Sequence, residues 1–145
     1  MKILVPVDGS KYSKEALKVA IDYAKAKGAD VNIISVASDA SGVDLEISIG
    51  ERERIGKRME QQADSIVKEA GEIMSKAGVK ADCKVITTPS SVADAILAFS
   101  EASHTDLIIM GSRGLSPSSR FKMGSVASQV VKYSDCSIYV VKLPQ

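Results

Sequence analysis

The sequence predicts one α/β domain over residues 1–145, a doubly wound parallel sheet of five strands in the order 3-2-1-4-5 with helices on both faces. Short β-branched runs alternate with longer helix-patterned segments along the chain. The runs are apolar at most positions, which is typical of parallel strands covered on both sides. With 145 residues, 45% hydrophobic and 26% charged, the chain matches one globular domain in size and composition.

The chain opens with a strand, a helix and a second strand. Residues 3–7 form an apolar run that ends in the turn residues 8–10. Ser10 is the expected N-cap of a helix with small and aliphatic residues along one face, and this helix ends near Gly28. Residues 31–36 form the second strand.

The start of the second helix is the hardest boundary to predict. Residues 38–56 combine glycines with mixed charges, so we expect a loop there. A helical apolar pattern then runs from Met59 to Met74, and the helix ends at Gly78. Residues 83–87 form the third strand.

The second half of the chain continues the alternation. Ser91, with Asp94 three residues later, is a capping box that opens the third helix. Residues 106–110 form the fourth strand, a final helix includes Val126, and residues 137–142 form the fifth strand.

In open parallel sheets, ligands bind beyond the carboxyl ends of the strands, where the strand order reverses. In the predicted order, the first and fourth strands flank that crevice. Asp8 and Gly111, which follow these strands, are therefore expected to face the same ligand. The loop from Val36 to Ser41, after the second strand, is a further candidate.

The loop after the fourth strand carries glycines at informative positions. Residues 111–114 read Gly-Ser-Arg-Gly, and nine residues later 124–126 read Gly-Ser-Val at the start of the last helix. Gly111 and Gly114 let the main chain approach a ligand closely, and Gly124 exposes amides at the positive end of a helix dipole. The residues alone predict an anion site, with a simple turn and helix cap as the alternative.

Charged and polar side chains accompany this loop. Arg113, Arg120 and Lys122 supply positive charge, and the Ser125 hydroxyl suits a phosphate oxygen or a metal ion. Neither the GxxxxGK[ST] pattern nor GxGxxG spacing is present.

Together these features resemble the universal stress protein family over nearly the whole chain. The matching pieces are ILVPVDGS, DLIIMGSRG, the spacing G-x2-G-x9-G-[ST] and the closing strand SIYVV. The sequence departs from the family at 87–91, where members often have a glycine, and at 133–137, where two prolines are missing.

The resemblance implies an adenine nucleotide, ATP by preference or else AMP or ADP, with Mg2+ or Mn2+ carried by the phosphates. It implies phosphates on the glycine loop and the base near the ends of the first two strands. The expected nucleotide-binding residues are Pro6, Val7, Asp8, Val36, Met110, Gly111, Ser112, Arg113, Gly114, Leu115, Gly124, Ser125 and Val126. The resemblance also implies a homodimer through the last strand, Ser137 to Lys142.

Composition narrows the function classes. With 19 basic and 18 acidic residues, no overall field favours nucleic acid or a membrane surface. Cys83 and Cys136 lack CxxC spacing, and we expect His104, the only histidine, at the surface rather than on a metal. No secretion signal or membrane span is visible, which favours the cytoplasm.

We therefore expect a nucleotide-dependent regulatory switch in stress response. The alternative is a slow Mg2+-dependent ATP hydrolase that uses the same pocket and Asp8. A phosphoacceptor domain of the receiver type is disfavoured because the third strand ends in Thr87-Thr88 rather than an aspartate. A structural dimer without a ligand is disfavoured by the intact glycine loop.

Overall fold

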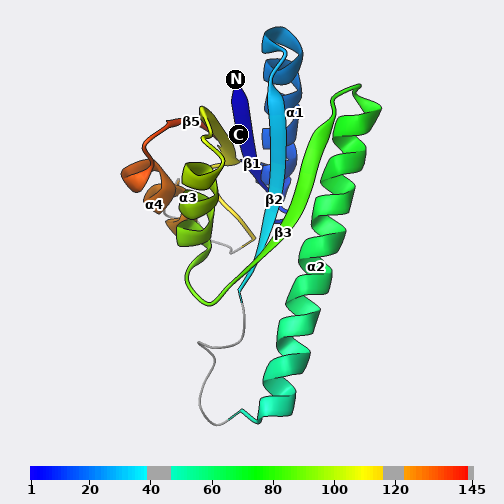
Figure 1. The fold of residues 1–145 in the computed structure, drawn as a ribbon, viewed down its shortest axis with the longest axis vertical. Helices are drawn as coiled ribbons and strands as arrows, with labels where there is room; N and C mark the ends of the chain where they lie inside the picture. The colour runs from blue at the N-terminus through cyan, green and yellow to red at the C-terminus, as the bar shows by residue number, and fades with distance from the viewer. Residues whose placement is uncertain (39–46, 116–122, 144–145) are drawn as a thin grey trace.

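The computed structural model describes residues 1–38, 47–115 and 123–143, and within these ranges strands and helices alternate strictly (Figure 1). The strands are β1 Lys2–Pro6, β2 Asp30–Ser38, β3 Ala81–Thr88, β4 Leu107–Gly111 and β5 Ser137–Val141. The helices are α1 Lys11–Lys27, α2 Ile49–Lys76, α3 Val92–Ala102 and α4 Ser125–Tyr133.

The five strands pair in parallel in the order β3-β2-β1-β4-β5, which confirms the predicted topology. Helices α1 and α2 cover one face of the sheet, and α3 and α4 cover the other (Figure 1). The strand order reverses between β1 and β4, so a crevice is expected at their carboxyl ends.

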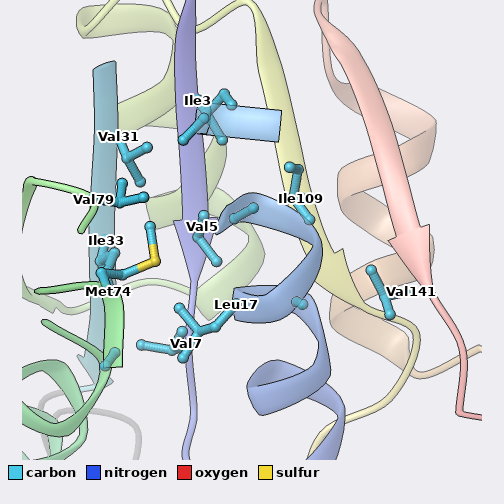
Figure 2. Close-up of a cluster of buried hydrophobic side chains, with 14 of the residues drawn as sticks. Ile3, Val5, Val7, Leu17, Val31, Ile33, Met74, Val79, Ile109 and Val141 are labelled. Carbon is cyan, nitrogen blue, oxygen red and sulfur yellow. The ribbon is translucent and has the colours of Figure 1, made fainter. Parts of the chain in front are cut away.

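Each face of the sheet has its own apolar core. Ile3 and Val5 of β1 point toward α1 and α2, in the cluster shown in Figure 2. Leu4, between them, points to the opposite face and packs with Ile96 and Ile108 under α3 and α4. Alternate residues of a strand face opposite sides of the sheet, so one strand supplies both cores.

The two edge strands differ from the expectation that strands are buried on both faces. In β3, Asp82 and Lys84 are exposed, and in β5 Tyr139 is 41% exposed. Each edge strand has a neighbour on one side only, and the helices cover it incompletely.

Helix α2 corrects one prediction: the loop expected over 38–56 is wrong for residues 49–56, which are helical. Residues 39–46 lie outside the described ranges. Ser48 caps α2, and its Oγ accepts a hydrogen bond from the Glu51 amide at 3.2 Å. This cap and a 28-residue length offset the glycines inside the helix, each of which costs about 1 kcal/mol. The first turns of α2 extend beyond the sheet (Figure 1).

The predicted N-caps of α1 and α3 and the predicted end of α1 at Gly28 are confirmed. Ser10 Oγ accepts from the Ser13 amide at 3.2 Å, and Ser91 Oγ accepts from the Asp94 amide at 3.1 Å. His104 follows α3, is exposed and has a φ of 54°. None of the described helices has the length and apolar character needed to cross a membrane.

Candidate functional site

A cavity of about 450 Å³ lies at the carboxyl ends of β1 and β4, on the face covered by α3 and α4. Twelve of the thirteen residues expected at the site line it, and they are Pro6, Val7, Asp8, Val36, Met110, Gly111, Arg113, Gly114, Leu115, Gly124, Ser125 and Val126. Arg120 and Lys122 lie outside the described residues. The structure therefore brings Asp8 and the glycines Gly111, Gly114 and Gly124 to one cavity, as the strand order predicts.

The cavity also has lining residues that sequence reasoning missed. These residues are Ser13, Ile34, Val92, Ile96, Met123 and Ala127. Four of the six are aliphatic, and Ile34 and Ile96 belong to the buried core of this face. In the sequence these four aliphatic residues have the pattern of ordinary core positions. Only the three-dimensional arrangement shows that they form the apolar wall of the cavity.

Ser112 is the expected site residue that does not line the cavity. It is 1% exposed, and its peptide groups bridge two elements. The Ser112 amide donates to the Val141 carbonyl at the end of β5, and the Ser112 carbonyl accepts from the Gly124 amide, both at 2.8 Å. Ser112 thus joins the start of α4 to the edge strand.

Asp8 lies in a tight turn at the end of β1. Its Oδ1 accepts from the Ser10 amide at 2.9 Å. Its Oδ2 faces Gly114 across the crevice, since a Cβ added at Gly114 would lie 2.6 Å from this oxygen. Gly114 is therefore a position where a side chain would collide with the Asp8 carboxylate.

Gly111 has a packing role that the sequence did not reveal. A Cβ added there would lie 2.6 Å from the Tyr12 Cβ and 2.9 Å from the Tyr12 carbonyl carbon. Real Cβ atoms do not approach backbone this closely, so the first turn of α1 can pack on the end of β4 only because Gly111 has no side chain.

Gly124 is different, because the fold itself does not require a glycine there. Its φ of −75° and ψ of 168° suit any residue, and an added Cβ would meet its nearest atom at an ordinary 3.6 Å. No side chain of the described residues caps α4. The first amides of α4, at Ser125 and Val126 on the cavity wall, therefore have no capping group among the described residues and lie at the positive end of the helix.

Arg113 adds a full positive charge at the same end of the cavity. Its Nη2 is buried and has no hydrogen-bond partner among the described residues. A buried donor without an acceptor is costly, and more so when it is charged. An anion in the cavity would supply the missing acceptor.

The donor set for a metal ion is small. Asp8 is the sole carboxylate among the described lining residues, and the described ranges hold no group of three potential metal ligands. A divalent cation would fit this site only if phosphate oxygens supplied most of its ligands.

Comparison with known proteins gives one consistent result. The model of the "Universal stress protein family" matches residues 1–142. Universal stress protein MJ0531 of Methanocaldococcus jannaschii is 34% identical over 144 residues, which cover 99% of this chain and 83% of that protein.

Solved structures share the fold. Universal stress protein UspA from Lactobacillus plantarum aligns with a TM-score of 0.82 at 20% identity, covering 98% of this chain and 97% of that chain. The universal stress protein from Archaeoglobus fulgidus in complex with dAMP aligns with a TM-score of 0.75 at 20% identity, covering 98% of each chain.

Proposed function

The chain belongs to the universal stress protein family, and we propose that it binds an adenine nucleotide, ATP by preference, in the cavity between β1 and β4. The observation that carries the proposal is the lining of this cavity, which combines aliphatic side chains with the Arg113 guanidinium and the uncapped N-terminus of α4. A nucleotide needs both kinds of contact, because it has a flat base and an anionic tail.

In the proposed complex, the phosphates bind the amides of residues 124–126 and the Nη2 of Arg113. The base lies against the apolar side chains of Val36 and Met110. The dAMP complex of the Archaeoglobus fulgidus relative supports an adenine nucleotide as the ligand class. Mg2+ or Mn2+ would bind through the phosphates, with Asp8 and the Ser125 hydroxyl in reach of the same cavity.

The proposed role is a regulatory switch in the cytoplasm that responds to nucleotide by differential affinity. The cavity favours binding over turnover, because the described lining residues include no histidine or lysine and a single carboxylate. Slow Mg2+-dependent hydrolysis is the second candidate, and the observation that favours it is the Asp8 Oδ2, which faces Gly114 and has no hydrogen-bond partner among the described residues. Loss of turnover in Asp8→Asn with retained ATP binding would support hydrolysis.

We also propose a homodimer through the last strand, Ser137 to Lys142. In the described ranges β5 pairs only with β4, which leaves its outer edge free for another strand. Ile138 and Val140 are only half-buried in the single chain. Sedimentation equilibrium would show a dimer, and Val140→Pro should convert it to a monomer because proline removes an amide and distorts the strand.

The first experiment is to denature the freshly purified protein, identify any released nucleotide by mass spectrometry, and titrate ATP and AMP by calorimetry with and without Mg2+. We expect stoichiometric nucleotide or micromolar binding. Gly114→Arg should abolish binding, because a side chain there collides with Asp8 and fills the cavity.

Gly56→Ala is the matched control. This glycine lies inside α2, and an added Cβ would meet no atom within 4 Å. The control should bind nucleotide like the original chain. Absence of nucleotide and of binding in the original chain would refute the proposed function.

A further inference from the structure

Ser13 has a role at this site that its sequence position does not suggest. We infer that Ser13 is a positioning residue, which fixes the Asp8 turn so that the Asp8 carboxylate faces the ligand. The inference rests on the proposed function, because it concerns how the same cavity binds its nucleotide.

Ser13 is the third residue of α1, is 5% exposed, and lines the cavity. Its hydroxyl is held on both sides. The Ser13 Oγ accepts from the Asp8 amide at 3.4 Å and donates to the Ser10 carbonyl at 3.1 Å. Ser13 therefore connects the first turn of α1 to the end of β1.

Among the described residues, these contacts engage only one of the two Asp8 carboxylate oxygens. The Ser10 amide occupies Oδ1, and the Ser13 hydroxyl accepts from the Asp8 main chain. Oδ2 has no hydrogen-bond partner among the described residues, and it is the oxygen that faces Gly114 across the crevice. A carboxylate held in this way presents one acceptor to a hydroxyl or amino group of a bound nucleoside.

Removing the Ser13 hydroxyl would release this arrangement. The Asp8 amide would lose its acceptor in a half-buried turn, and an unpaired amide favours a different turn conformation. The carboxylate would then sample several directions, and the nucleotide would have to order it on binding.

Ser103 provides a matched control for a purely structural hydroxyl. It follows α3, and its Oγ donates to the Phe99 carbonyl at 2.6 Å. This bond resembles the one from Ser13 to Ser10, but Ser103 does not line the cavity. A general effect of losing a hydroxyl near a helix end should appear in both Ser→Ala variants.

The experiment is a double-mutant cycle. ATP and AMP are titrated by calorimetry into the original chain, Ser13→Ala, Asp8→Ala, the double variant and Ser103→Ala. We expect Ser13→Ala to weaken binding about five- to tenfold, the order expected for one lost hydrogen bond at a site. In the Asp8→Ala background, Ser13→Ala should have no further effect, and Ser103→Ala should bind normally.

Three results would overturn the inference. Unchanged affinity in Ser13→Ala would show that the hydroxyl does not matter for binding, and equal losses with and without the Asp8 carboxylate would show that Ser13 acts independently of it. Equal losses in Ser13→Ala and Ser103→Ala would show a general structural effect.

A second pair keeps the test valid if Ser13→Ala unfolds. Ser13→Thr and Ser13→Val have nearly the same shape and differ in the hydroxyl, so the threonine variant should bind more tightly, and equal affinities would refute the inference. If the original chain binds no nucleotide, the proposed function fails together with this inference. If it binds and the cycle shows no coupling, the inference alone fails.

Discussion

Helices α3 and α4 begin beside the same cavity, on the same face of the sheet, and their N-termini differ. The α3 end is closed by its own chain, since Ser91 caps it and Asp94 adds a negative charge in the first turn. The α4 end begins at Gly124, has no acidic residue in its first turn and has no capping side chain among the described residues.

Identical backbone groups therefore serve two purposes. A capped N-terminus stabilises the fold, because its donors are already satisfied. An uncapped N-terminus beside a cavity keeps its donors for another molecule, and the fold gives up part of the capping energy. The following variants exchange or remove these features, and they are ordered by expected effect.

Gly124→Asp should cause the largest change. The aspartate would cap α4 with a carboxylate, occupy the amides that we assign to phosphate, and repel the phosphate charge. We expect ATP affinity to fall about 100-fold, the sum of a lost charge-assisted contact and like-charge repulsion. Calorimetry measures the affinity, and thermal unfolding without nucleotide should show a protein at least as stable as the original. Unchanged affinity would exclude the α4 end as the phosphate site.

Arg113→Gln should come next. Glutamine keeps a hydrogen-bond donor but removes the positive charge of the guanidinium, whose Nη2 is buried. We expect about tenfold weaker ATP binding. The salt dependence of Kd should also become shallower, because one ionic contact is lost. The same salt dependence in both proteins would indicate that Arg113 does not contact the phosphates.

Ser91→Ala should act on stability instead of binding. Loss of the cap of α3 should lower the free energy of unfolding by about 1 kcal/mol, measured by urea denaturation. ATP affinity should stay within a factor of about two. Asp94 remains in the first turn, so the uncapped α3 end should not become a second phosphate site. A large loss of affinity would mean that both helix ends contact the ligand.

Gly124→Ser should give the smallest change. A serine at this N-cap has room for its Cβ and should raise the free energy of unfolding by a few tenths of a kcal/mol. Its hydroxyl competes for one amide but carries no charge, so ATP affinity should fall far less than in Gly124→Asp. Equal losses in both variants would point to the backbone flexibility of glycine as the relevant property.

The strand order and the location of the cavity could be predicted from the sequence, because alternating apolar runs and short turns restrict the topology. The expectation that Asp8 and Gly111 face the same ligand followed from that topology, because they come after the two strands that flank the crevice. The start of α2 was missed, because Gly50 and Gly56 hide the helical pattern. A usable signal was present in Ser48 and Glu51, which have the spacing of a capping box.

The apolar wall and Ser13 were missed for another reason. Ile34 and Ile96 have the pattern of core residues, and a sequence does not show that a core position borders a cavity. Gly111 matched a ligand-binding pattern, yet its close neighbour in the structure is Tyr12. Contacts between residues far apart in the sequence, such as Gly111 and Tyr12, decide whether a residue packs against the fold or lines the cavity.

The main chain of Ser112 connects the cavity to the edge of the sheet. Its amide is hydrogen-bonded to Val141 of β5 and its carbonyl to Gly124, the N-cap of α4, so Ser112 links the edge strand to the start of this helix. A rotation of α4 about its N-terminus would therefore be transmitted through Ser112 to Val141, the last residue of the strand that we assign to dimer contact. The rate at which the Ser112 amide exchanges its hydrogen with water would therefore report whether its hydrogen bond to the Val141 carbonyl is formed or broken.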